Sequence, residues 1–98
     1  MTLNTRTPLE AHRKEMQRSF IYRAIDKIVS EKEKKGIHPA RATWRELRDV
    51  LKEEHWPLLD ELVELDRVKK YDSINYPTYE VNWRQIHADE AWLKRVIR

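Results

Sequence analysis

The chain has 98 residues, 38% of them charged, and the charges nearly cancel to a formal net charge of +3. A chain of this length is expected to form one domain over residues 1–98, and the absence of cysteine excludes disulfide bonds and thiolate chemistry. The apolar runs are too short to cross a membrane and the first residues lack an apolar signal core, so we expect a soluble cytoplasmic protein.

The first predicted element is a long helix over residues 7–35. Thr7, Pro8 and Glu10 match the N-cap, the first-turn proline and the capping-box carboxylate of a helix start. Gly36, the only glycine, follows a cationic last turn and marks the end. Large apolar groups are few in the first half, so the first turns are expected to project beyond the core, into solvent or onto a partner such as a second copy.

A second helix is predicted over residues 43–54, where Thr43 and Glu46 form another capping-box pattern. Three arginines lie just before this helix or on one flank of it, namely Arg41, Arg45 and Arg48. Two interpretations remain open. The stripe is either a solvated, salt-bridged surface, or a group that holds a phosphate backbone near a helix N-terminus.

A third helix is predicted over residues 57–65, with Pro57 in its first turn. Leucines and Val63 cover more than half of its circumference, so most of it belongs in the core. The remaining arc is entirely acidic and consists of Asp60, Glu61 and Glu64. Trp56, just before this helix, is a candidate surface anchor.

After this helix the periodicity changes to that of a β-hairpin over residues 68–81, with strands near Val68–Ile74 and Thr78–Val81. Val68 and Tyr71 are three positions apart, so a regular strand would place them on opposite faces of the sheet. A bulge or a late start of the strand is therefore expected if both face the core. Three basic residues lie at the start of the hairpin, namely Arg67, Lys69 and Lys70. They either grip phosphates or protect an edge strand from aggregation. Tyr76 lies near the tip, exposed or covered by a partner.

The last predicted helix covers residues 89–97. Asn82 and Asp89 are alternative N-caps, and we favour Asp89 because one continuous helix would place its carboxylate among apolar side chains. The apolar set of this helix is Trp92, Leu93, Val96 and Ile97. We expect it to pack on the first helix, within one chain or across a dimer.

The predicted fold class is therefore mainly α with a small β-hairpin (α+β). The segments TWRELRDVL and LLDELVELDRVKKY, in which a leucine-rich helix leads directly into a basic strand, carry a resemblance to the winged helix-turn-helix superfamily over residues 20–81. A long leading helix and an added terminal helix are also common in dimeric bacterial and phage regulators of this kind.

The resemblance implies DNA binding with the third helix in the major groove. Three carboxylates on that helix would repel the phosphates within a Debye length of about 8–10 Å. We therefore expect a regulatory protein that contacts double-stranded DNA through the hairpin, which is the wing of this fold, and through the arginine-bearing flank of the second helix. It is expected as a possible homodimer that forms through the first and last helices. The residues expected to contact phosphates are Arg41, Arg45, Arg48, Arg67, Lys69 and Lys70.

The alternative function is a protein-interaction module that binds a basic protein surface and does not bind DNA. The residues expected at that surface are Trp56, Asp60, Glu61, Glu64 and Tyr76. Enzymatic activity is not expected, because the four histidines lack metal-ligand spacing and a single glycine cannot form a phosphate-binding loop. No metal or other cofactor is predicted.

Overall fold

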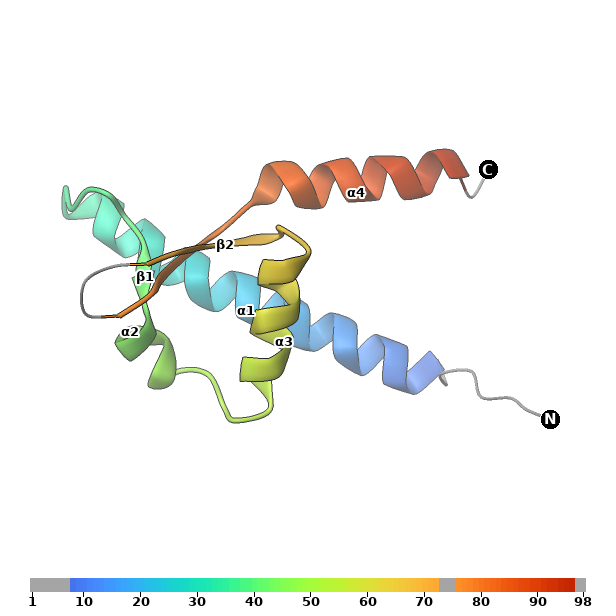
Figure 1. Cartoon of the computed structure of the whole chain (residues 1–98), viewed down its shortest axis with the longest axis horizontal. Helices are drawn as coiled ribbons and strands as arrows, with labels where there is room; N and C mark the ends of the chain where they lie inside the picture. Colours follow the sequence, from blue (N-terminus) through green and yellow to red (C-terminus); the bar gives the residue numbers. More distant parts are fainter. Residues whose placement is uncertain (1–7, 73–75, 97–98) are drawn as a thin grey trace.

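The structure is a computed structural model that describes residues 8–72 and 76–96. Its elements are α1 (Pro8–Lys34), β1 (Ala42–Thr43), α2 (Trp44–Arg48), α3 (His55–Glu64), β2 (Val68–Tyr71), β3 (Thr78–Val81) and α4 (Trp83–Val96). This arrangement, shown in Figure 1, confirms the predicted α+β fold with its hairpin. It also contains a strand that the sequence pattern did not predict, because β1 pairs with β3 in an antiparallel sheet of order β1-β3-β2.

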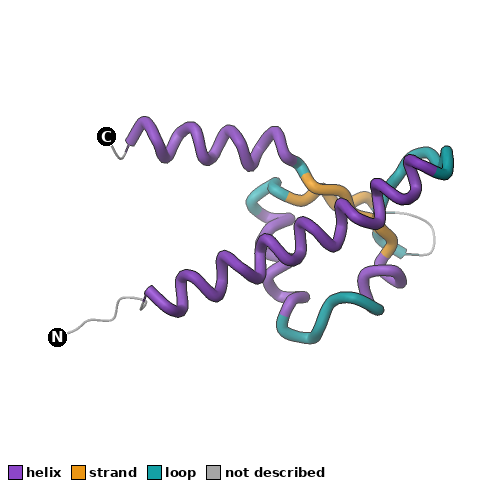
Figure 2. Tube along the Cα trace, turned by 180° about the vertical axis from the view of Figure 1, so that it is seen from behind, coloured by secondary structure: helices purple, strands orange, loops and turns teal. Residues whose placement is uncertain are grey.

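The hydrophobic core lies between α1, α3 and the inner face of the sheet. Ile21 and Ile25 are fully buried on α1, and Leu59 and Leu62 on α3, because spacings of three or four residues place each pair on one helix face. Tyr79 of β3 is also buried. In Figure 2, α1 crosses the sheet and α3, and its N-terminal turns extend beyond both, as predicted. Among the described residues, no helix combines the length and apolar character needed to span a membrane.

The register of the hairpin explains why Val68 and Tyr71, in the first predicted hairpin strand, do not share a face. Val68 pairs with Val81 and Tyr71 pairs with Thr78, with continuous pairing between them, so the described strands contain no bulge. Val68 is buried on the inner face of the sheet, and Tyr71 lies on the outer face. The strand ends at Tyr71 rather than at Ile74, which lies outside the described residues.

The second helix is much shorter than the predicted range 43–54, because α2 ends at Arg48 with Asp49 as its C-cap. The backbone N–H groups of Val50 and Leu51 both donate to the carbonyl of Leu47, which closes the helix in a tight turn. That turn buries Leu51 and leaves Val50 exposed, whereas a continuing helix would keep both on one apolar face. The prediction was wrong because the burial of Leu51 in the core outweighs the local helical pattern.

The third helix starts two residues before the predicted range 57–65. His55 is buried, its ring stacks on Phe20 with 4.9 Å between centroids, and its Nδ1 accepts a hydrogen bond from the backbone of Lys52 at 2.9 Å. Pro57 remains in the first turn, where its missing N–H removes no helical hydrogen bond.

The last helix starts at Trp83, so the predicted start at Asp89 was wrong and the alternative cap is used. The side chain of Asn82 accepts a hydrogen bond from the backbone of Gln85 at 3.4 Å. The carboxylate of Asp89 is accommodated within the helix because Arg67 binds it at 2.9 Å. Trp92 is 61% exposed and Leu93 is 46% exposed, so these two side chains are not buried against α1 of the same chain, which was one of the two expected arrangements. Ile97 of the predicted set lies outside the described residues.

Replacing Leu59 by alanine tests the position of the core. Leu59 is fully buried between α1 and the sheet, so Leu59→Ala is expected to lower the free energy of unfolding by about 2–5 kcal/mol. Leu65→Ala, at a leucine just beyond α3 that is 46% exposed, is the control and is expected to change it by less than about 0.5 kcal/mol. Urea unfolding followed by circular dichroism measures both, and equal losses would contradict this core.

Candidate nucleic-acid interface

The start of α2 is held by a capping box and by a lysine from α1. The backbone N–H of Glu46 donates to the Thr43 hydroxyl at 3.2 Å, and the Glu46 carboxylate accepts from the Thr43 backbone at 3.0 Å. Lys32 donates to the Glu46 carboxylate at 2.6 Å and to the carbonyl of Arg41 at 2.7 Å. Burial raises the pKa of Glu46, but the hydrogen bonds from Lys32 and Thr43 outweigh burial and hold this pKa below its usual value. The junction of β1 and α2 is therefore fixed against α1.

A cation–π contact joins the two regions that were predicted to bind phosphates, the second-helix flank and the hairpin. The guanidinium of Arg41, just before β1, lies 3.5 Å from the ring centroid of Tyr71 at the end of β2. The Tyr71 hydroxyl donates a hydrogen bond to Glu80 of β3, and this bond raises the pKa of Tyr71. Because β3 lies between β1 and β2, the contact spans the whole sheet. The second-helix flank and the wing thus belong to one surface.

The sheet register sets the distance between these two regions. Thr43 pairs with Thr78, and Thr78 pairs with Tyr71 on its other side. Two steps between paired strands place the Cα atoms of Thr43 and Tyr71 about 10 Å apart. The backbone N–H of Trp44 also donates to the carbonyl of Pro77 at 3.1 Å, so α2 begins directly beside the start of β3, as Figure 1 shows.

Four basic side chains are exposed around this junction, namely Arg45, Arg48, Lys69 and Lys70. Lys69 shares the outer face of the sheet with Tyr71, whereas Lys70 lies opposite Tyr79 and therefore on the face that α3 covers. On α2, the Arg48 guanidinium lies 5.2 Å from the ring centroid of Trp44. The basic groups therefore lie at both edges of the sheet, on α2 beside β1 and on both faces of β2.

Arg67 is not part of this group, although it was predicted with the wing. It precedes β2, at the far end of that strand from Tyr71, and binds Asp89 of α4 at 2.9 Å. Burial raises the pKa of Tyr22 on α1, and the nearby charge of Arg67 opposes this increase. Through its ion pair with Asp89, Arg67 connects α4 to the start of β2. Asp89 lies 22 positions away in the chain, so the local sequence contained no signal for this pair.

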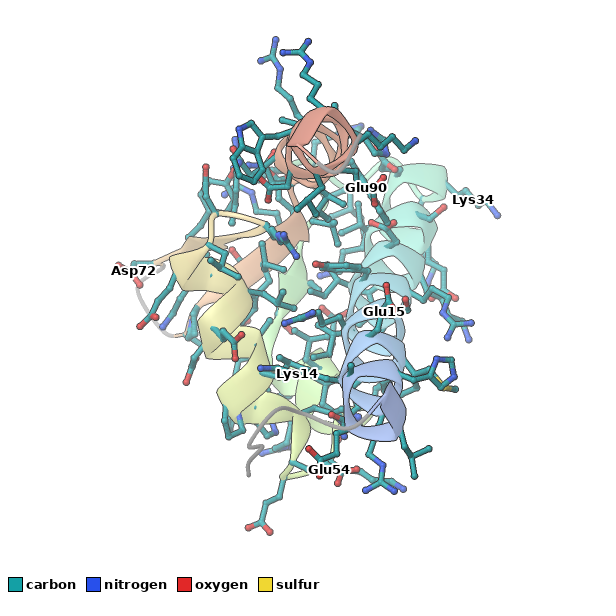
Figure 3. All side chains as sticks on the ribbon, turned by 90° about the vertical axis from the view of Figure 1, so that its right-hand side faces the viewer. Lys14, Glu15, Lys34, Glu54, Asp72 and Glu90 are labelled. Carbon is teal, nitrogen blue, oxygen red and sulfur yellow. The ribbon has the colours of Figure 1, made fainter. Side chains whose placement is uncertain are left out.

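The acidic surface of α3 is smaller than predicted. Glu61 is half-buried and lies 3.4 Å from the ammonium of Lys14 and 3.6 Å from a guanidinium nitrogen of Arg18, both from α1. Figure 3 shows Lys14 between α1 and α3. Asp60 and Glu64 remain exposed. The third helix therefore presents two carboxylates to solvent at these positions, and the charge of Glu61 is compensated within the chain.

The aromatic residues of the alternative partner surface differ in exposure. Trp56 is half-buried, packs against the core and lies 6.4 Å from Trp44 between ring centroids. Tyr76 is 38% exposed. The partner set is therefore divided between packed and exposed side chains.

Tyr71, the aromatic residue at the centre of the candidate interface, was missed as a site residue. Its parity mismatch with Val68 was the available signal that its ring faces outward.

Within residues 8–72 and 76–96, no group of three or more histidine, aspartate or glutamate side chains is placed to hold a metal ion. Comparisons of the chain with protein-family models, with curated proteins and with solved structures found no match.

The ion pair of Asp89 predicts a pH dependence of stability. Hydrogen bonds from Arg67 and Gln85 lower the pKa of Asp89 below its ordinary value of 3.8. A lowered folded-state pKa stabilises the fold at neutral pH, and this contribution disappears as the pH falls below about 4. Asp89→Asn is therefore expected to be less stable than the unmodified chain at pH 7, with a smaller difference at pH 3.

Urea unfolding at pH 7 and pH 3 measures this difference. Glu64→Gln is the control, because Glu64 is an exposed carboxylate on α3, and it is expected to match the unmodified chain at both pH values. A deficit of Asp89→Asn that stays the same at both pH values would contradict a role for the ionised carboxylate.

Proposed function

We propose that this protein is a cytoplasmic, DNA-associated regulatory protein that contacts the phosphates of double-stranded DNA with the hairpin and α2. It is proposed as a binding protein rather than an enzyme, and the proposal requires no cofactor. The observation that carries the proposal is the contact of Arg41 with Tyr71, because it unites two basic regions that are 30 residues apart in the chain. The helix pair followed by a hairpin is consistent with the winged-helix resemblance.

The charge balance at this surface supports phosphate binding. The carboxylate of Glu46 at this surface is already compensated inside the chain by Lys32, and Asp49 lies 4.0 Å from Arg48. Arg45 and Lys69 are exposed and available to phosphate oxygens. A surface with this composition attracts a polyanion over several ångströms before contact is made.

The same geometry predicts how the DNA is held. Asp60 and Glu64 remain on the exposed face of α3, so this helix is expected to stay out of the major groove. Contacts made only to phosphates fix the position of a protein on DNA but read no bases. We therefore expect binding with little sequence preference and a Kd in the range of about 1–100 µM at physiological salt.

The alternative partner surface is less well supported. Glu61 faces α1 and Trp56 packs against the core, which leaves Asp60, Glu64 and Tyr76 exposed from the five residues of that set. A compact interface needs a buried aromatic anchor at its centre. Of the two aromatic residues considered as the anchor, Trp56 packs against the core and only Tyr76 remains exposed.

Charge reversal on the wing is the direct test. The double variant Lys69→Glu with Lys70→Glu is expected to weaken binding to a labelled mixed-sequence duplex more than tenfold. Two lost phosphate contacts also reduce the slope of log Kd against log salt concentration by about 2. Fluorescence anisotropy at several salt concentrations measures both effects.

The matched control reverses the same number of charges elsewhere. Lys27 and Lys34 are exposed on one face of α1, and Figure 3 shows Lys34 on the side of the molecule away from Asp72 at the end of the hairpin. Lys27→Glu with Lys34→Glu is expected to leave the salt slope unchanged. No binding by the unmodified chain at low salt, or equal losses in both double variants, would refute the proposal and favour a protein partner.

A second test addresses the stacking of Arg41 on Tyr71. Tyr71→Ala removes the ring that holds the guanidinium, and a cation–π contact of about 0.5–1 kcal/mol corresponds to a loss of roughly two- to fivefold in DNA affinity. Tyr71→Phe keeps the ring and removes only the hydroxyl that binds Glu80, so it is expected to bind DNA like the unmodified chain. The same anisotropy assay separates the two variants. Equal affinities for both would show that the stacking does not position Arg41 for phosphate.

A further inference from the structure

A groove lies between α1 and α4 at the end of the molecule away from α2. Its volume is about 590 Å³. The α1 wall includes His12, Glu15, Met16 and Tyr22, and the α4 wall includes Trp83, Ile86 and Glu90. A second hollow, bordered by Leu93, shares Glu15, Tyr22, Ile86 and Glu90 with the first and continues the groove along α4. In Figure 3, Glu15 and Glu90 mark its two sides, with α4 seen end-on above α1.

Two polar contacts set the angle at which α4 leaves the core. The indole N–H of Trp83 donates to Asp26 of α1 at 2.8 Å, and Arg67 binds Asp89 at 2.9 Å. Both contacts lie in the first half of α4. The second half extends away from the core beside the projecting part of α1, as Figures 1 and 2 show. The two helices therefore diverge, and the groove between them stays open within the described part of the chain.

Both walls carry large apolar side chains that the described chain leaves exposed. The exposed fraction is 57% for Met16 on α1 and 46% for Leu93 on α4. Trp92, next to Leu93, does not line the groove but protrudes from α4 with 61% of its surface exposed. Contiguous apolar surface of this kind is a feature of interaction sites in soluble proteins. The α4 positions that line the groove, Trp83, Ile86, Glu90 and Leu93, follow the alternating three- and four-residue spacing of helices that pack side by side.

We propose that the occupant of this groove is a second copy of the chain, whose α4 end inserts between α1 and α4. One chain supplies both parts of the contact, because Trp92 and Leu93 project at the end of α4 and the apolar groove lies beside them. In a dimer with two-fold symmetry, the α4 end of each chain then fills the groove of the other, and both contacts use the same surface. The result is a four-helix arrangement of two α1 and two α4 helices.

Charge complementarity supports a second copy over an unrelated partner. The groove walls contribute the carboxylates of Glu15 and Glu90 and the guanidinium of Arg23, whereas Arg18 faces Glu61 and Arg67 binds Asp89. The exposed end of α4 carries Lys94 and Arg95, which can approach the two carboxylates. Insertion of a partner α4 brings these opposite charges together at the rim of an apolar contact. In Figure 1, α2 and β1 lie at the opposite end of the molecule from the free ends of α1 and α4. The surface with the Arg41–Tyr71 contact, next to β1, therefore stays accessible in such a dimer.

The oligomeric state of the full chain tests this inference without DNA. Sedimentation equilibrium from about 1 to 500 µM is expected to show a reversible dimer of the 12.0 kDa chain. Leu93→Glu places a carboxylate in the groove beside Glu15 and Glu90, and it is expected to raise the dimer Kd at least about thirtyfold. Leu65→Glu is the matched control, since Leu65 is also 46% exposed but lies beyond α3, and it is expected to remain dimeric.

Met16→Glu on the opposite wall provides a second variant if Leu93→Glu does not fold, as judged by circular dichroism. A chain that remains monomeric over the whole concentration range overturns the inference. A dimer that persists in both groove variants overturns it as well, because the contact then lies elsewhere. Neither result affects the DNA proposal, which is decided by the salt-dependent anisotropy of the Lys69 and Lys70 variants.

Discussion

The structure depends on one constraint, which is that the rest of this small chain can cover only the middle of the 27-residue helix α1. Ile21 and Ile25 are fully buried because α3 and the sheet close over this part of α1. At a rise of about 1.5 Å per residue, α1 is about 40 Å long, so its first turns project beyond the core. The molecule is elongated as a result, with extents of 53 × 31 × 22 Å, and it has two separate ends.

Ion pairs between distant elements decide which charges remain available for a partner. Lys32 fixes the start of α2 through Glu46, and Arg67 fixes α4 through Asp89. Glu61 faces two cations of α1 and contributes less negative charge to the exposed face of α3 than its sequence position suggests. These pairs are partly buried, and besides any stability they contribute they fix the geometry of the elements and the charges left at the surface.

The two ends of the molecule have different chemistry, which separates the two proposals. Arg41 stacked on Tyr71 marks a basic end built from α2 and the hairpin. Met16 and Leu93 mark an apolar end built from α1 and α4. Phosphate binding is electrostatic and weakens with salt, whereas a helix–helix contact depends mainly on buried apolar area. A dimer through the apolar end would present two basic ends to one duplex.

The sequence by itself determined the elements whose signals are local. The long first helix, the third helix, the second hairpin strand and the capping box at Thr43 follow from periodicity and side-chain chemistry within a few residues. Only the tertiary structure decided the early end of α2, the start of α4 and the existence of β1. Burial of Leu51, the binding of Asp89 by Arg67 and the pairing of Ala42 with Tyr79 produce these features. The sequence also placed Arg41 and Lys69 among the basic candidates, but it could not bring them together, because the sheet register that does so joins segments about 30 residues apart.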